Sequence, residues 1–85
     1  MSAITATPDP VHAGKNLHIC YEFSPGQQSV TLTIHYNTAH GDVLVGITLS
    51  PTDPCYDRDV PSNCTGVLIV DDSGSAQDCA VTVIP

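Results

Sequence analysis

The sequence predicts an all-β domain, built as an antiparallel β-sandwich of six to seven short strands. Three observations support this prediction. Apolar and polar residues alternate in several short segments, which is the pattern of strands with one buried face. These segments recur about every ten residues, with proline, glycine and aspartate between them, as is typical of sandwiches. Finally, no segment carries apolar residues at helical spacing between capping residues.

The predicted strands are residues 2–7, 16–23, 29–36, 43–49, 66–70 and 79–84. The clearest is 16–23, because every second residue from Leu17 to Phe23 is apolar. The first strand ends at residues 8–10, since their prolines cannot donate to a sheet ladder. Strand 43–49 is expected to turn four residues inward, namely Val43, Val45, Ile47 and Leu49. The predicted connections are turns at 24–28, 37–42 and 71–78 and a long loop at 51–66.

The cysteines are expected to stabilise a single domain that spans residues 1–85. A chain of 85 residues buries a small core, so an additional covalent constraint is expected. Its four cysteines are even in number and contain no Cys-x-x-Cys pair, which favours disulfides over zinc. Disulfides persist in oxidising compartments. We therefore expect an extracellular or secreted protein, exported with a leader that is later removed or without one.

The pairing of the cysteines is predicted as Cys55 with Cys64, which closes a short loop, and Cys20 with Cys79. One observation disagrees with the second pair. Cys20 falls on the polar face of its strand, whereas Cys79 falls on an apolar face, so a β-bulge is needed to bring them together. Otherwise Cys20 meets Cys55 or Cys64 at a sheet edge. A cytosolic protein with four reduced cysteines is the remaining alternative.

The charge balance excludes several classes of partner. The formal net charge is −7, and Lys15 and Arg58 are the only fixed positive charges. Binding to nucleic-acid phosphates or to anionic membrane surfaces depends on clusters of basic residues, so neither is expected. No apolar run approaches the roughly 18 residues of a membrane span, so no membrane insertion is expected.

Residues 4–19 resemble the opening strands of the immunoglobulin-like modules of extracellular proteins, with a strand that ends in Pro-x-Pro before a glycine turn. Residues 67–83 are similar to the closing hairpin of these modules, with its Asp-x-x-Gly turn. The resemblance implies an immunoglobulin-like sandwich and no particular function. The chain departs from antibody domains in lacking tryptophan and in its cysteine spacing. In size, acidity and cysteine content it also resembles, in general character, the small lectins of fungal fruiting bodies.

The segment 51–66 is the strongest functional candidate, since it holds the only arginine, three of the seven prolines and two cysteines. Its carboxylates, amide and guanidinium suit sugar hydroxyls, and a tyrosine can pack against an apolar sugar face. A bridge would hold the loop in one shape before a ligand arrives. The candidate ligand-binding residues are Asp53, Tyr56, Asp57, Arg58, Asp59 and Asn63. The alternative is that the charges around Arg58 form a surface ion pair without a ligand.

Metal and catalytic sites are weaker candidates. Calcium is possible at Asp53, Asp57 and Asp59, or at Asp71, Asp72 and Asp78, but neither run fits the known calcium loop. The histidines follow no zinc-ligand spacing and are expected to be exposed; they are His12, His18, His35 and His40. No nucleophile elbow, catalytic cysteine signature or phosphate loop occurs, so an enzyme is not expected.

These observations predict a non-enzymatic binding protein without a cofactor, whose partner is a glycan or another cell-surface ligand and whose leading ligand class is carbohydrate. Two other functions are kept as alternatives. One is a structural or adhesion module of a larger cell-surface protein, and the other is a small inhibitor or toxin that presents the bridged loop to a protein. A homodimer through an edge strand is also expected, because few charges protect the edges.

Overall fold

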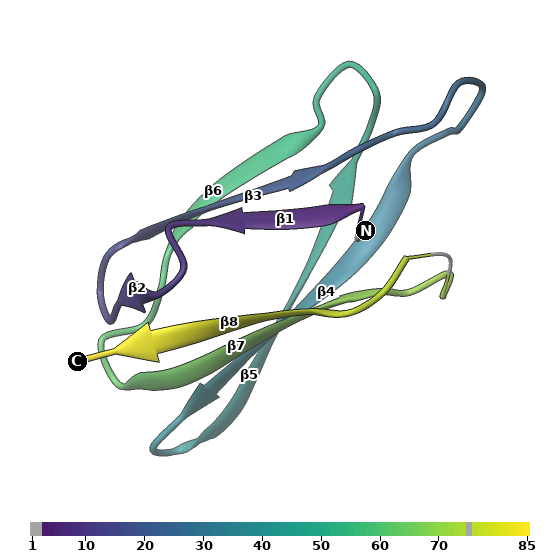
Figure 1. The fold of residues 1–85 in the computed structure, drawn as a ribbon. Helices are drawn as coiled ribbons and strands as arrows, with labels where there is room; N and C mark the ends of the chain where they lie inside the picture. The colour runs from purple at the N-terminus through teal and green to yellow at the C-terminus, as the bar shows by residue number, and fades with distance from the viewer. Residues whose placement is uncertain (1–2, 75) are drawn as a thin grey trace.

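The computed structural model describes residues 3–74 and 76–85, and its regular structure is β throughout (Figure 1). Its strands are β1 (Ile4–Thr7), β2 (Val11–His12), β3 (Asn16–Tyr21), β4 (Val30–Thr38), β5 (Gly41–Leu49), β6 (Cys55–Asp59), β7 (Cys64–Asp71) and β8 (Cys79–Ile84). One sheet has the order β1-β3-β6 and the other the order β2-β8-β7-β4-β5. The prediction of an all-β chain is confirmed. Ser2 of the predicted strand 2–7 and Ser75 of the predicted turn 71–78 lie outside the described residues.

Strand β3 follows the predicted alternation, and Leu17, Ile19 and Tyr21 are buried. It ends at Tyr21, earlier than the predicted 16–23. Phe23 still packs against the core, but the chain then turns at 24–27, where the backbone N–H of Gln27 donates to the carbonyl of Ser24 at 2.9 Å. The prolines and glycine of this segment therefore set the end of the strand.

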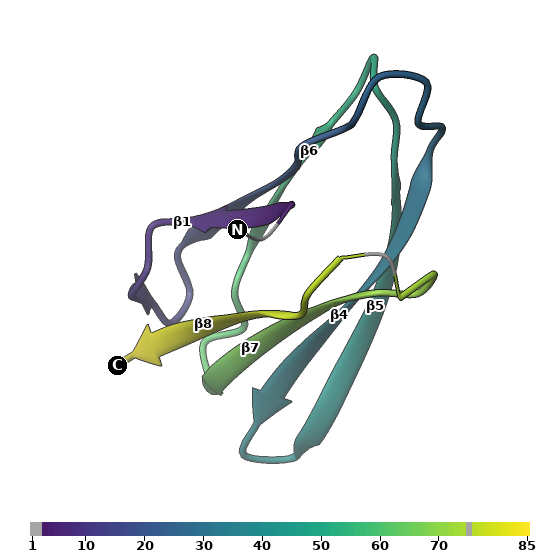
Figure 2. The ribbon, with the colours of Figure 1, turned by 45° about the vertical axis from the view of Figure 1, so that its right-hand side comes forward.

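Strands β4 and β5 form a hairpin whose turn is closed by Thr38 and Gly41, which are paired in the register. Gly41 has a φ of 107°, a conformation that favours glycine. Ile47 and Leu49 are buried as predicted, but Val43 is 44 % exposed. The expectation that Val43 points into the core is wrong because the end of this hairpin extends past the three-stranded sheet (Figure 2).

Two short strands were not predicted, and one of them changes the topology. Strand β2 pairs with β8 in parallel, with Val11 opposite Val83, so the sheets are not wholly antiparallel as predicted. The chain thus leaves the first sheet after β1, passes through the prolines of 8–10 and joins the second sheet. Strand β6 lies in the predicted loop 51–66 and pairs only with β3. An edge strand carries little apolar alternation, which is why the sequence indicated a loop.

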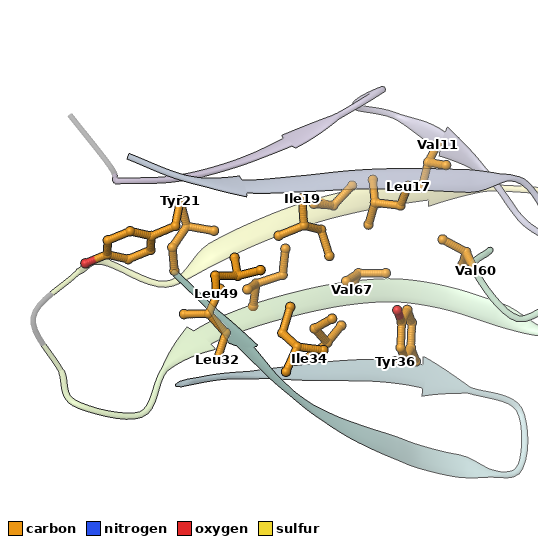
Figure 3. Packing of buried hydrophobic residues seen from close by; sticks show 14 of the residues in the cluster. Val11, Leu17, Ile19, Tyr21, Leu32, Ile34, Tyr36, Leu49, Val60 and Val67 are labelled. Atoms are coloured by element: carbon orange, nitrogen blue, oxygen red, sulfur yellow. The ribbon is translucent and has the colours of Figure 1, made fainter. Parts of the chain in front are cut away.

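A single core lies between the two sheets (Figure 3). Leu17 and Ile19 enter it from β3, and Leu32 and Ile34 enter it from β4, all fully buried. Burying side chains of this size contributes about 1.5–3 kcal/mol each, before the entropy of ordering is subtracted. The facing residues of the two sheets therefore hold the layers together.

Asp71 is the one charged side chain that the described residues bury, at 3 % exposure, and it orders the turn after β7. Its Oδ1 accepts hydrogen bonds from the backbone N–H and the hydroxyl of Ser73, at 2.9 and 2.7 Å. Its Oδ2 accepts one from the backbone N–H of Ala76, at 3.2 Å. The aspartate satisfies the backbone donors of the turn, which is the turn chemistry expected for the segment 71–78.

Replacing Tyr36 by phenylalanine is expected to raise the free energy of unfolding by about 1 kcal/mol. Tyr36 is 1 % exposed, and its hydroxyl has no hydrogen-bond partner among residues 3–74 and 76–85. Burying a hydroxyl without a hydrogen-bond partner costs desolvation free energy. The phenylalanine variant avoids this cost because it has no hydroxyl. Urea unfolding at pH 7 measures the change. A loss of stability in the variant would contradict the assignment of an unpaired hydroxyl.

The same side chain predicts a loss of stability in alkali. Burial raises the pKa of Tyr36, although Arg58 acts in the opposite direction. Because the unfolded chain ionises near the ordinary value of about 10, it binds fewer protons than the folded chain above that pH. The free energy of unfolding is therefore unaffected by this ionisation below about pH 10, and it falls as the pH rises from there through the pKa of Tyr36 in the folded chain. The phenylalanine variant is expected to lack this part of the pH dependence in urea unfolding.

Candidate functional site

The segment 51–66 is not one continuous loop. It begins with a tight turn in which the backbone N–H of Asp53 donates to the carbonyl of Ser50 at 2.9 Å. The chain then forms β6, turns again at 61–64 and enters β7. The prediction of a continuous loop over 51–66 is wrong, because pairing with β3 makes the middle of this segment a strand.

The disulfide joins Cys20 to Cys55, residues that lie directly opposite each other in the β3–β6 pair with Cα atoms 4.1 Å apart. The predicted pairs Cys55–Cys64 and Cys20–Cys79 are both wrong, and Cys64 and Cys79 are free thiols. The reason is topological. Cys64 and Cys79 lie in the five-stranded sheet, whereas Cys20 and Cys55 share the other one. The alternative in which Cys20 meets Cys55 at a sheet edge, suggested by its polar face, is the one observed.

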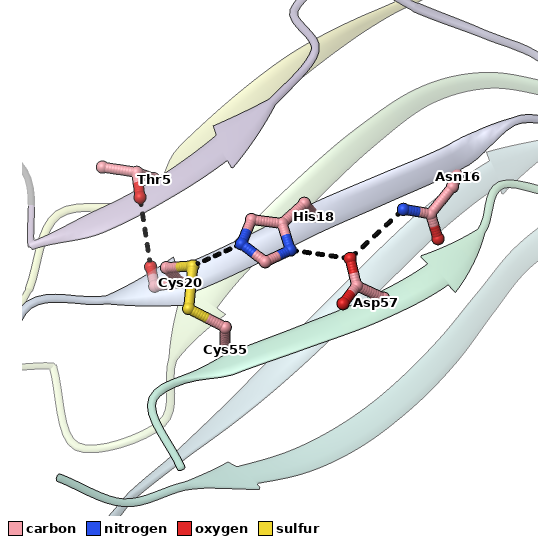
Figure 4. The surroundings of a disulfide bond; sticks show 6 residues. All are labelled: Thr5, Asn16, His18, Cys20, Cys55 and Asp57. Carbon is pink, nitrogen blue, oxygen red and sulfur yellow. Dashed lines mark hydrogen bonds and ion pairs between the residues drawn. A yellow bond between two sulfur atoms is a disulfide. The ribbon is translucent and has the colours of Figure 1, made fainter. Parts of the chain in front are cut away.

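Beside the disulfide, three polar side chains are linked on the outer face of the three-stranded sheet (Figure 4). His18 lies opposite Asp57 in the register, and its Nδ1 is 2.6 Å from Asp57 Oδ1. Asn16 Nδ2 donates to the same oxygen at 3.2 Å. We call Asn16, His18 and Asp57 the polar row. Because they stand on paired strands, the backbone ladder fixes their spacing.

The electrostatics of the polar row favour one tautomer of His18. The hydrogen bonds from His18 and then from Asn16 hold the pKa of Asp57 below its usual range, so this carboxyl is ionised at neutral pH. An ionised carboxylate only accepts hydrogen bonds, so Nδ1 of His18 is the donor. Its Nε2 then faces Cys20 Sγ at 3.0 Å. His18 and Asp57 are 45 % and 57 % exposed, so solvent and ligands reach them.

The six predicted site residues do not converge on one surface. Asp57 and Asp59 alternate with Tyr56 and Arg58 along β6, so the two pairs project from opposite faces of the strand. Tyr56 packs against the core, and Arg58 Nη1 donates to its hydroxyl at 3.4 Å. In the described part of the chain, Asp57 forms its ion pair with His18 rather than with Arg58.

The other two predicted residues lie at the ends of the segment. Asp53 belongs to the tight turn with Ser50, before β6 begins. Asn63 lies just before β7, and its carbonyl accepts a hydrogen bond from the N–H of Ala39 at 3.3 Å. Both are exposed, and within residues 3–74 and 76–85 neither forms a hydrogen bond with the polar row. The structure therefore distributes the predicted site over the whole length of the edge.

Asn16 and His18 were not predicted as site residues, although a signal was present. They alternate with apolar residues on the polar face of the segment 16–23, together with Cys20. The sequence did not indicate that this strand pairs with β6. That pairing brings His18 next to Asp57, which is 39 positions away in sequence. No local pattern encodes that contact.

Among the described residues, one group of three potential metal ligands lies close together. It consists of His18, Cys20 and Cys55, whose ligand atoms lie within 4.8 Å of one another. The two aspartate runs considered for calcium do not gather in this way. Of the other histidines, His12 lies 3.3 Å from the carbonyl of Pro85 through its Nδ1. His35 stands on β4 and His40 in the turn after it.

A shallow groove of about 400 Å³ lies on the five-stranded sheet, lined in part by His35, Leu68 and Ala80. Leu44, His35, Leu68 and Ala80 form one row across β5, β4, β7 and β8 in the register. We call this the apolar row. Leu44 is 60 % exposed and Leu68 is 37 % exposed, so the row presents unburied apolar surface.

Comparison with known proteins leaves the function to be inferred from these side chains. The chain matches no protein-family model, no curated protein and no solved structure. In the described residues no helix is long and apolar enough to cross a membrane.

Proposed function

We propose that this protein is a non-enzymatic, carbohydrate-binding module of immunoglobulin-like topology that works outside the cell. The observation that carries the proposal is the polar row, which lies beside the free edge of β6 and is fixed by the strand ladder. The Cys20–Cys55 disulfide, next to that row, favours an oxidising compartment.

The immunoglobulin-like topology is supported by the order of the strands. The sheet β1-β3-β6 has the order of strands A, B and E in that fold. The run β8-β7-β4-β5 has the order of strands G, F, C and C′. Strand D has no counterpart among the described strands. The disulfide also differs, because it lies within one sheet instead of joining strands B and F.

Carbohydrate is the ligand class that the chemistry along β6 fits. Sugar hydroxyls both donate and accept hydrogen bonds, and Asp57 Oδ1 is already oriented by His18 and Asn16. A chain of sugars lying along β6 would meet Asp57 and Asp59 on one side of the strand. On the other side it would meet Arg58 and the exposed part of Tyr56, whose ring otherwise packs against the core. Because the row is held in place before binding, little side-chain entropy is lost.

A glycan array tests this proposal. The protein is expected to bind a selective set of glycans, and Asp57→Ala and Arg58→Ala are each expected to weaken binding by about tenfold or more. Asp78→Ala, an exposed carboxylate just before β8 of the other sheet, serves as the matched control and should bind as the parent does. The melting temperature of all three variants should stay unchanged. An array without signal at high protein concentration would refute carbohydrate binding.

A structural or adhesion module is the second candidate function, and the apolar row favours it. Leu44 and Leu68 expose apolar surface that a protein partner would cover. The long edge strand β5 is also the proposed contact of a homodimer, because Asp42 is its only charged residue. Sedimentation with Leu44→Asp as the variant measures this association. The third possibility, an inhibitor or toxin, depended on a Cys55–Cys64 bridge, and Cys64 is a free thiol.

A further inference from the structure

Three side chains around the disulfide carry the donor atoms of a soft metal site. They are His18 and Cys20 on β3 and Cys55 on β6 (Figure 4). One ring nitrogen of His18 and the two Sγ atoms all lie within 4.8 Å of one another, and Nε2 is the nitrogen that faces Cys20 Sγ. All three side chains project from the same face of paired strands, and all are partly exposed. Two sulfurs and one imidazole are the donors that Zn²⁺ prefers in proteins.

We infer that reduction of the Cys20–Cys55 disulfide opens a site for one Zn²⁺ ion, held by both thiolates and by Nε2 of His18. In the oxidised chain the two sulfurs are bonded to each other and the site is closed. The inference is independent of the carbohydrate-binding proposal. It needs only the positions of these residues on β3 and β6, which pair along the whole length of β6.

The spacing of the donors suits a tetrahedral ion. Bond lengths of about 2.3 Å to sulfur and 2.0–2.1 Å to nitrogen place the donors roughly 3.5–3.8 Å apart. Nε2 of His18 already lies 3.0 Å from Cys20 Sγ. Cys20 and Cys55 stand directly opposite each other with Cα atoms 4.1 Å apart, so side-chain rotation alone separates their sulfurs to that distance. The strands do not have to move.

Asp57 supplies the outer partner that such a site requires. A histidine ligand donates its second ring N–H to a carboxylate or a carbonyl, which fixes the tautomer and the ring orientation. Here Nδ1 of His18 is 2.6 Å from Asp57 Oδ1, and Nε2 points to the sulfurs. Asn16 in turn holds Asp57 Oδ1 at 3.2 Å. The histidine is therefore already oriented for a metal on its Nε2 side.

The proposed conversion balances with a dithiol as the reductant. A thiolate of the dithiol attacks one protein sulfur, and its second thiol completes the exchange. The dithiol is oxidised to its own disulfide, and Cys20 and Cys55 become two thiols. Zn²⁺ then binds both as thiolates, and two protons are released to the solvent. The fourth position of the ion, which no protein donor of the cluster fills, is left for water or for an external ligand.

Cobalt titration tests the inference, with Co²⁺ as the probe for the zinc site. The background is Cys64→Ala/Cys79→Ala, so that Cys20 and Cys55 are the only cysteines. After reduction with a dithiol and its removal without oxygen, one equivalent of Co²⁺ should produce thiolate-to-cobalt charge-transfer absorption. Zn²⁺ should displace it, and the oxidised protein should show none. Asp57→Asn is expected to weaken binding by about 10–100-fold, and His18→Ala should weaken it further.

His35→Ala is the matched control, because His35 lies on the other sheet and should leave Co²⁺ binding unchanged. Circular dichroism follows the fold throughout. If reduction unfolds the chain, added Co²⁺ is expected to restore the β spectrum in the parent. In the His18→Ala variant it should not restore that spectrum. The inference is overturned if the reduced protein shows no charge-transfer absorption. It is equally overturned if His18→Ala binds as tightly as the parent, or if added Co²⁺ fails to refold an unfolded reduced chain.

Discussion

Replacing Cys20 and Cys55 together by alanine is expected to lower the free energy of unfolding by about 3–4 kcal/mol. The bridge joins residues that are 35 positions apart, and it restricts the unfolded chain accordingly. A domain of this size has a net stability of only about 5–15 kcal/mol, so the loss is a large fraction of the total. Urea unfolding without metal, read by circular dichroism, measures the change.

The free cysteines provide the control for the disulfide. In the Cys64→Ala/Cys79→Ala variant, a reductant should lower the stability by the same amount, because the bridge is intact there. In the Cys20→Ala/Cys55→Ala variant, the reductant should change nothing. Equal stability of the parent and the Cys20→Ala/Cys55→Ala variant would show that the bridge does not constrain the unfolded chain.

Ile34→Ala is expected to destabilise the protein by about 3–4 kcal/mol, within the range known for such core truncations. Ile34 is fully buried in the middle of β4, and it lies opposite Val45 on β5 and Ile69 on β7. The smaller side chain leaves a cavity that these neighbours cannot fill, because the strand ladders hold them on both sides. Urea unfolding at neutral pH measures this difference.

Two milder variants of β4 sharpen the test of the core. Ile34→Val removes one methylene and should cost only about 0.5–1.5 kcal/mol. Thr31→Ala changes an exposed residue of the same strand and should stay within about 0.5 kcal/mol of the parent. If Thr31→Ala cost as much as Ile34→Ala, strand propensity rather than core packing would hold β4 in place.

The sequence was sufficient to predict the central strands of this fold, for a physical reason. Strands β3 and β4 each bury one face, so apolar residues recur at every second position and mark both the strand and its buried side. Strand β6 has no such mark, because as an edge strand it leaves Asp57, Arg58 and Asp59 exposed. The prolines on either side of β6 also favoured the prediction of a loop.

The candidate site was predictable only in part. Asp57 was identified from its position among the polar residues of 51–66, but its partner His18 comes from a strand far away in sequence. The pairing of Cys20 with Cys55 depends on the same contact between β3 and β6. Alternation assigns a residue to a face of its strand, whereas register between distant strands is set by the packing of the whole domain. That information is absent from any local pattern.

The parallel pair of β2 and β8 has a mechanical consequence. Both strands run in the same direction, and the N–H of Ala13, just after β2, donates to the carbonyl of Ile84 at 2.8 Å. A tension applied between the start of β2 and the C-terminus pulls the two strands along their lengths in opposite directions. The hydrogen bonds between them are then loaded in shear and together, instead of opening one after another. We therefore expect the β2–β8 pair to resist extension between these two points, because its hydrogen bonds have to break together.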